Sequence, residues 1–149
     1  MKAGTRQKIH PKMVGDQSEA MVIARLVQAG KMVLLPFGEN QRYDILVDEG
    51  DHFIRVQCKT GRLRSGAIRF NTCSNTYHHP NNRGTKTYRH SYVGQADVFG
   101  VYCPDTDGVY LVPVDHVGHN AAALRIDPTL NNQMKGVRWA VDYQLHPPG

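Results

Sequence analysis

The sequence predicts an α/β fold in which a mixed, mainly antiparallel central sheet is flanked by helices. Three observations predict it: an amphipathic helical segment near the N-terminus, a series of short apolar runs separated by Gly, Pro and Asp, and two of these runs joined by a short acidic turn. A chain of 149 residues fits a single domain, residues 1–149, because one hydrophobic core usually serves ~100–200 residues. Residues 1–13 are basic and are expected to be flexible.

Residues 17–29 are predicted to form a helix that ends at Gly30, since glycine commonly follows the last turn of a helix. The apolar residues of this segment recur at helical spacing: Ala20, Ile23, Ala24 and Val27. Residues 31–36 form a short apolar run that predicts a strand. Residues 43–48 and 53–60 then predict a hairpin around the turn at 49–51.

The second half of the chain predicts further strands on either side of a long polar segment. Residues 67–73 indicate a strand, and residues 74–94 are predicted to be a long loop rich in His, Asn, Arg and Tyr, a length typical of functional loops. Residues 98–103 and 109–114 predict another strand pair, and a short helical or irregular turn begins at Asp115. Edge strands or a partly helical finish are expected at 124–126 and 137–143.

The composition indicates a soluble, basic protein of a reducing compartment. Eighteen Lys and Arg residues against thirteen Asp and Glu residues give a net charge of +5, which favours a polyanionic partner. The three widely spaced cysteines argue against a disulfide framework, and the N-terminus lacks the apolar block of a secretory signal. We therefore expect a cytoplasmic protein, associated with the nucleoid if its polyanionic partner is DNA.

Asp44 and the triplet Gln57-Cys58-Lys59 lie on the two arms of the predicted hairpin. Asp44 is near the start of the first arm and Lys59 near the end of the second, so antiparallel pairing brings them together. The two-residue period of a strand puts Gln57 and Lys59 on one face, while Cys58 points away. Phosphodiester hydrolysis uses such a set, because oxygen ligands hold a hard cation such as Mg²⁺ while a lysine orients water or neutralises charge.

The chain resembles the PD-(D/E)XK nucleases, and more specifically the homing endonucleases of that superfamily associated with group I introns and their small bacterial and phage relatives. The resemblance covers roughly residues 14–114, with a weaker echo at 136–143. The motifs that carry it are Gly15-Asp16 through Glu19, PFGEN-x-R-x-D at 36–44, VQCKTGRLR at 56–64, a Tyr-rich segment at 77–92 and GVYLVPV at 108–114.

This resemblance implies a restriction-endonuclease-like core and a Mg²⁺-dependent endodeoxyribonuclease that acts on double-stranded DNA, with Mn²⁺ able to substitute. It implies catalytic roles for Glu19, Asp44, Gln57 and Lys59, of which the first three would hold the metal. Gln57 departs from the acidic residue of most relatives and brings no charge, but the intron-associated branch uses glutamine there. The resemblance also implies a homo-oligomer, a dimer or tetramer, because one active site cuts one strand.

Basic and amide side chains near the predicted site suit DNA contacts, with Arg and Lys on phosphates and Asn on base edges. The candidate DNA-binding residues are Arg42, Arg62, Arg64, Asn75, Tyr77, Arg83, Lys86 and Arg89. A solvated, mobile polar loop is the alternative explanation for the second half of this set. Zinc binding by the nearby histidines and Cys73 is disfavoured, because the spacing fits no known finger.

Each candidate also has an ordinary structural explanation when it is taken alone. Glu19 could be a solvated acid on a helix, Asp44 could belong to a turn, and Gln57 and Lys59 could be the exposed face of an amphipathic strand. Two other functions remain open. One is a branched-DNA nuclease, resembling Holliday junction resolvases, or a repair nuclease with the same core; the other is a DNA-binding module whose catalytic centre has decayed at Gln57.

Overall fold

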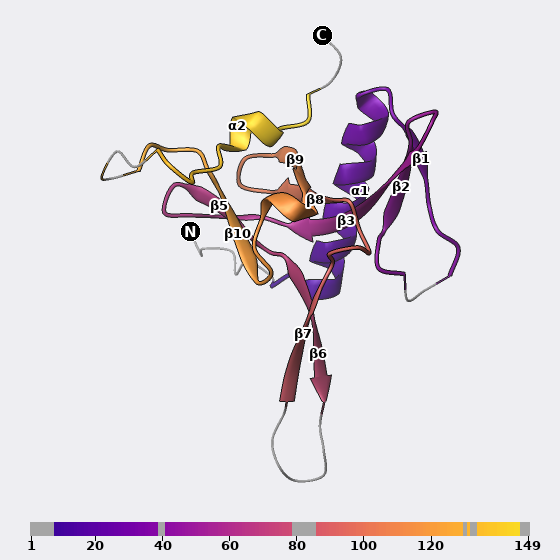
Figure 1. Ribbon diagram of the computed structural model, residues 1–149, viewed down its shortest axis with the longest axis horizontal. Helices are drawn as coiled ribbons and strands as arrows, with labels where there is room; N and C mark the ends of the chain where they lie inside the picture. Colours follow the sequence, from indigo (N-terminus) through magenta and orange to yellow (C-terminus); the bar gives the residue numbers. More distant parts are fainter. Residues whose placement is uncertain (1–7, 39–40, 79–85, 130, 132–133, 147–149) are drawn as a thin grey trace, which may run out of the picture.

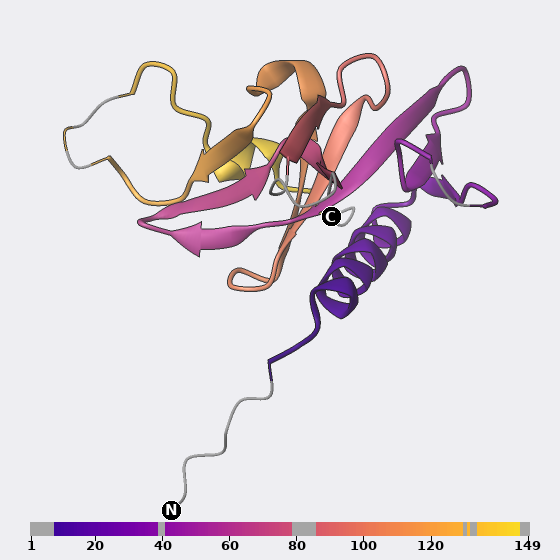
Figure 2. The ribbon, with the colours of Figure 1, turned by 90° about the horizontal axis from the view of Figure 1, so that it is seen from below.

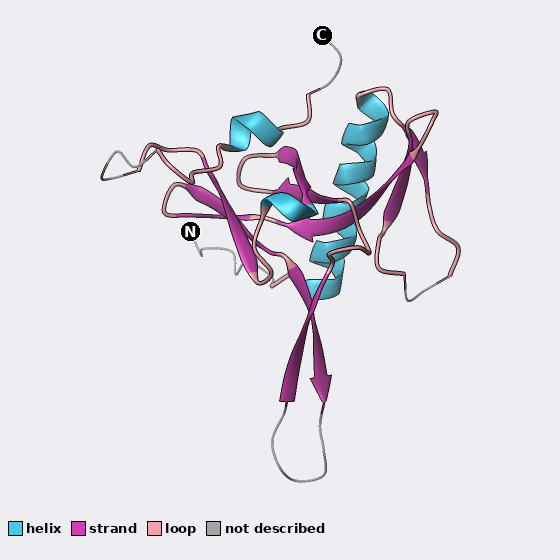
Figure 3. Ribbon diagram, in the orientation of Figure 1, coloured by secondary structure: helices cyan, strands magenta, loops and turns pink. Residues whose placement is uncertain are grey.

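The structure is a computed structural model that describes residues 8–38, 41–78, 86–129, 131 and 134–146. Two helices, a 3₁₀ turn and ten strands make up the described part (Figures 1 and 3). In chain order these are α1 (Pro11–Gln28), β1 (Met32–Leu34), β2 (Ile45–Asp48), β3 (Phe53–Thr60), β4 (Arg62–Arg64), β5 (Ala67–Asn71), β6 (Cys73–His78), β7 (Lys86–Ser91), β8 (Val98–Cys103), β9 (Gly108–Pro113), η1 (Val114–His116), β10 (Ala121–Arg125) and α2 (Ala140–Tyr143).

The central sheet has five strands in the order β1-β2-β3-β8-β9. Only β3 and β8 run parallel, and the other neighbours are antiparallel. A second sheet has the order β10-β5-β4, and β6 pairs with β7 separately. The predicted fold class, α/β with a mixed and mainly antiparallel central sheet, is confirmed.

Helix α1 lies along one side of the five-stranded sheet (Figures 1 and 2). Its buried residues are Ser18, Val22 and Leu26, spaced four apart, whereas Ala20 and Val27 of the predicted apolar stripe are exposed. The helix was therefore predicted correctly but its inner face was not, because a serine occupies one of the three buried positions. α1 also begins six residues earlier than predicted, at Pro11, where proline loses no helical hydrogen bond.

The opposite side of the sheet carries the larger hydrophobic core. Phe99 and Val101 of β8 are fully buried there against Ile68 and Phe70 of β5 and Leu124 of β10. Phe70 and Phe99 meet edge to face with ring centroids 5.9 Å apart. The sheet therefore has α1 on one face and the second sheet on the other, and both cores depend on β3 and β8.

Residues 73–78 and 86–91 form an antiparallel strand pair where the sequence predicts a long loop. The pair projects away from the rest of the protein (Figure 1). A strand pair with no apolar face to bury shows no alternation of apolar and polar residues, which explains why the pattern reads as a loop. β4 was also missed, since three residues directly after Gly61 are too short for a periodic signal.

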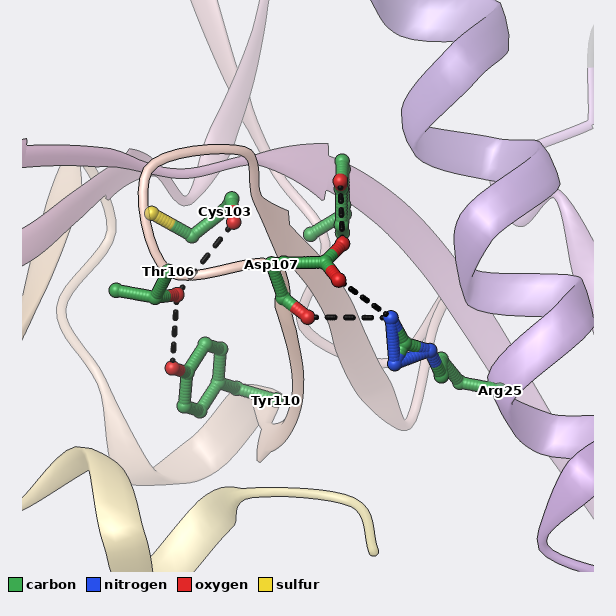
Figure 4. A network of polar contacts seen from close by, with 6 residues as sticks. Arg25, Cys103, Thr106, Asp107 and Tyr110 are labelled. Atoms are coloured by element: carbon green, nitrogen blue, oxygen red, sulfur yellow. Dashed lines mark hydrogen bonds and ion pairs between the residues drawn. The ribbon is translucent and has the colours of Figure 1, made fainter. Parts of the chain in front are cut away.

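A network of polar contacts holds the C-terminal half of α1 against the turn between β8 and β9 (Figure 4). Arg25 of α1 donates to the carboxylate and the backbone carbonyl of Asp107, both at 3.2 Å. The hydroxyl of Tyr102 donates to the same carboxylate at 2.9 Å. These contacts fix where α1 lies along the sheet, and therefore where its side chains reach the sheet edge.

Within the described residues, neither helix combines the length and apolar character needed to cross a membrane. Cys58 and Cys103 are free thiols, as the odd cysteine count predicts.

Candidate active site

The β2–β3 hairpin brings Asp44 next to the triplet at 57–59. The register pairs Ile45 with Val56, so Asp44, the residue before β2, lies across from Gln57, and its N–H donates to the Val56 carbonyl at 2.8 Å. Its carboxylate then accepts the N–H of Cys58 at 2.9 Å. The side chain of Asp44 thus takes the place of a strand partner just before β2 begins, which fixes the carboxylate at the sheet edge.

Glu19 reaches the same edge from α1. Glu19 and Asp44 line one pocket of about 290 Å³, together with Leu35, Pro36, Gly38, Gln41 and Tyr43. Gln57 and Lys59 do not line this pocket. The two predicted carboxylates, Glu19 and Asp44, therefore line the same pocket. The Gln57 amide and the Lys59 ammonium belong to β3, the strand that pairs with β2 next to Asp44.

A buried hydroxyl pair sets the position of Glu19. The hydroxyls of Ser18 on α1 and Thr60 at the end of β3 lie 2.5 Å apart, and Ser18 is only 2% exposed. Ser18 precedes Glu19 and Thr60 follows Lys59, so this hydrogen bond ties together the two segments that carry the candidate residues. The sequence analysis did not identify this pair, although Ser18 stands four residues before Val22 on the buried face.

The pKa values of both carboxylates are raised, and burial is the main cause for each. Burial raises the pKa of Glu19, and the charges of Asp44 and Asp16 raise it further. Burial also raises the pKa of Asp44, which outweighs the opposite effects of the Cys58 N–H and the Lys59 ammonium. The pKa of the Cys58 thiol is raised by burial and then by the charges of Asp44 and Glu19, so this thiol is a poor nucleophile at neutral pH.

This donor set fits a hard divalent cation. Among the described residues, no three His, Cys, Asp or Glu side chains gather at one point, so the available ligands are two carboxylates and an amide. The side chain of Gln57 makes one long hydrogen bond, from its amide nitrogen to the Cys58 carbonyl at 3.4 Å, which leaves its amide oxygen without a partner in the described structure. A cation here would favour the ionised form of Glu19, whose pKa is raised by burial and then by the charges of Asp44 and Asp16.

The Lys59 ammonium lies at the base of the β6–β7 pair. It is 3.2 Å from the Cys73 carbonyl and 3.5 Å from the Tyr92 hydroxyl. It also lies 4.7 Å from the centre of the Tyr92 ring. Lys59 is near enough to Asp44 to lower the pKa of that carboxyl, so acid and ammonium flank the same strand end.

The candidate DNA contacts fall into three groups. Arg62, Arg64 and Arg89 are exposed. Arg42 is occupied within the chain, where its guanidinium contacts Gln95, donates to Ser74 Oγ at 2.7 Å and lies over the Tyr92 ring. The whole of Arg83, and the side chains of Asn75, Tyr77 and Lys86, lie outside the described residues.

Comparisons with known proteins identify a matching family and a similar fold. A model of the PD-(D/E)XK endonuclease family matches residues 9–146 of the chain. Among solved structures, the bacterial homing endonuclease I-Ssp6803I is similar with a TM-score of 0.69 at 20% sequence identity, over 91% of this chain and 89% of that chain. At this identity the structural likeness shows a shared fold. No curated protein sequence matches the chain.

Proposed function

Because the chain belongs to the PD-(D/E)XK endonuclease family, we propose that this nuclease is a divalent-metal-dependent enzyme that hydrolyses phosphodiester bonds in duplex DNA. The observation that carries the proposal is the meeting of Glu19 and Asp44 in one pocket beside the strand end that also presents Lys59. Mg²⁺ is the proposed ion, with Mn²⁺ as a substitute, because carboxylate and amide oxygens are the ligands both accept.

Glu19, Asp44 and Gln57 would hold the ion, which when bound polarises the phosphate and favours deprotonation of an attacking water. Contacts within the chain hold these ligands in place. Asp44 cannot swing away while its carboxylate accepts the Cys58 N–H, and the hydroxyl pair next to Glu19 holds α1 at the required distance. Lys59 would donate to water or to a phosphate oxygen and offset the negative charge that develops there.

Exposed cations around this edge would hold the DNA backbone. Arg62 and Arg64 lie on β4, three and five residues after Lys59 in the chain. Arg89 lies on the projecting strand β7. We assign these residues to phosphate contacts, and extend the proposal to Asn75, Tyr77, Arg83 and Lys86 from their sequence alone. Arg42 would act on DNA only if it left its contacts within the chain.

One pocket of this kind cuts one strand, so cleavage of both strands requires two copies. We therefore propose that the enzyme acts as a homo-oligomer, a dimer or tetramer. Its site of action would be the nucleoid in the cytoplasm.

Plasmid cleavage tests the proposal. Supercoiled and linear DNA are incubated with the protein in Mg²⁺, Mn²⁺ or EDTA, and Asp44→Asn and Lys59→Met should each lose cleavage. Two matched controls make the same substitutions at an aspartate and a lysine that do not line the pocket. Asp48→Asn alters an acid at the end of β2, whose carboxylate accepts the Gly50 N–H at 2.8 Å. Lys31→Met removes a lysine that forms an ion pair with Glu49.

The assignment is wrong if Asp44→Asn or Lys59→Met cuts as fast as the parent. Preferential cleavage of a four-way junction over linear duplex would make the protein a structure-selective nuclease that uses the same residues. Salt-dependent duplex binding with no cleavage in either metal would instead indicate a DNA-binding module with an inactive centre.

A further inference from the structure

Tyr92 is a buried tyrosine whose hydroxyl end faces Lys59. It follows β7 directly and is only 4% exposed. Its ring meets Phe99 of the main core edge to face, with centroids 5.7 Å apart and an interplanar angle of 87°. This contact fixes the plane of the ring, because aromatic pairs in a packed core hold one geometry. The hydroxyl is thereby held at a set point near the end of β3.

The Lys59 ammonium is held at that point by groups from the base of the β6–β7 pair. The Cys73 carbonyl lies 3.2 Å away at the start of β6, and the Tyr92 hydroxyl lies 3.5 Å away just after the end of β7. The face of the Tyr92 ring adds a favourable cation–π contact at 4.7 Å. A lysine side chain has many rotamers, so it keeps one position only when several contacts select it.

Arg42 also contacts the ring of Tyr92. Its guanidinium carbon lies 4.1 Å from the centre of the Tyr92 ring. The guanidinium also donates to Ser74 Oγ at 2.7 Å and to the Ser91 carbonyl at 3.0 Å. Arg42 stands two residues before Asp44, so one arginine links the segment of the metal-binding acid to the strand pair that holds the lysine.

We propose that Tyr92 is the positioning residue for Lys59, holding the ammonium beside Asp44 through its hydroxyl and its ring. The inference rests on the proposed function, because Lys59 assists hydrolysis only if the chain is a nuclease. It also assigns a second role to the projecting strand pair. The same element that presents Arg89 to DNA supports the lysine at the reacting phosphate, so its docking on the core is needed for the chemical step.

Single-turnover cleavage of saturating duplex in Mg²⁺ tests this role. Tyr92→Phe, which removes only the hydroxyl, should slow cleavage by about tenfold, and Tyr92→Leu, which also removes the ring, by about a hundredfold. Duplex affinity measured in EDTA should stay within about twofold of the parent for Tyr92→Phe. The matched control is Tyr143→Phe in helix α2, which loses a hydroxyl contact with His116 Nδ1 at 3.4 Å and should cut at the parent rate.

Two outcomes overturn the inference while the nuclease assignment stands. One is a Tyr92→Phe protein that cuts at the parent rate when Lys59→Met is inactive. The other is a Tyr92→Phe protein whose defect lies in duplex affinity and not in the single-turnover rate. Tyr92→Phe retains the ring and so the core contact, which keeps the test independent of any folding defect in Tyr92→Leu.

An NMR measurement tests the positioning role even if the parent fails to cleave. The ring of Tyr92 should shift the Hε resonance of Lys59 upfield, and Tyr92→Leu should return it to the position of a solvent-exposed lysine. A parent resonance already at the exposed position would overturn the positioning role. Failure of cleavage with the upfield shift present would instead count against the proposed function alone.

Discussion

Gly100 lies where α1 packs against β8, and substitution by alanine should displace the helix. A Cβ at this position would lie 2.8 Å from Val22 Cγ1 and 2.9 Å from Val56 Cγ1, whereas ordinary van der Waals contact begins at 3.4 Å. The structure must therefore open by 3.4 − 2.8 = 0.6 Å toward the helix and 3.4 − 2.9 = 0.5 Å toward β3. Val22 cannot turn aside, because a valine in a helix keeps one strongly preferred rotamer.

The expected cost has two parts. Overpacking of this kind destabilises by about 1–3 kcal/mol. Replacing glycine in a strand recovers roughly 0.5–1 kcal/mol of backbone entropy. The net loss then falls between about 0 and 2.5 kcal/mol, and we expect a value near the middle, roughly 1 kcal/mol. For a domain of this size, that lowers Tm by about 2–4 °C per kcal/mol.

The displacement should also reach the active site. Glu19 stands three residues before Val22, so the turn that carries it moves with the helix, away from Asp44. Catalytic groups tolerate about 0.5 Å of misplacement, and about 1 Å costs on the order of a hundredfold in rate. We therefore expect Gly100→Ala to cut about tenfold more slowly than the parent at a fixed Mg²⁺ concentration.

Urea unfolding and plasmid cleavage measure both effects. Gly15→Ala is the matched control, because the added Cβ on α1 meets nothing within 4 Å and should stabilise the helix by about 0.5–1 kcal/mol with cleavage unchanged. The reasoning is refuted if Gly100→Ala unfolds at the same urea concentration as the parent or at a higher one. Parent-level cleavage by a clearly destabilised Gly100→Ala protein would refute the link to Glu19.

Other predictions follow from the contacts at the same edge. The pKa of Asp44 is raised in the folded protein, mainly by burial, so the folded state favours the protonated carboxyl. Protonated Asp44 therefore contributes to the free energy of unfolding in full below the pKa of the unfolded chain, and this contribution is lost as pH rises through the pKa of the folded protein. In EDTA, Asp44→Asn should therefore unfold at higher urea than the parent at pH 7 but not at pH 3, and no difference at pH 7 would contradict this. Ser18→Ala should lower the free energy of unfolding by about 1–2 kcal/mol, because the Thr60 hydroxyl loses its partner; an unchanged urea midpoint would show that the pair contributes nothing. Replacing Arg62 and Arg64 by alanine should reduce the slope of log affinity for duplex against log salt by about 1.8, which is about 0.9 for each phosphate that is no longer neutralised. An unchanged slope would remove both from the DNA interface.

The part of the site carried by the hairpin could be predicted from the sequence. Asp44, Gln57 and Lys59 lie within sixteen positions of one another in the chain, on two strands joined by a short turn, and local pairing together with the two-residue period determines how they meet. β8 was predicted over the same residues that the structure shows, since a continuous apolar run bounded by polar residues marks a buried strand.

The contacts that position the site could not be predicted in this way. Ser18 and Thr60 are 42 residues apart, and Lys59 and Tyr92 are 33 apart. No local period connects such pairs, because the parallel pairing of β3 with β8 and the docking of the β6–β7 pair decide which residues meet. The strand pair was missed because residues 73–78 and 86–91, which pair with one another, lack the apolar alternation that marks a strand in the sequence.

The central claim is that one divalent cation binds between α1 and the end of the β2–β3 hairpin. Anomalous scattering from a crystal soaked in Mn²⁺ tests it most directly, since the signal locates the ion independently of any assay. The account predicts a peak within coordination distance of carboxylate oxygens of both Glu19 and Asp44, which disappears in Asp44→Asn. A crystal of the parent with no peak there, or with its Mn²⁺ bound at residues away from this pocket, would contradict the account.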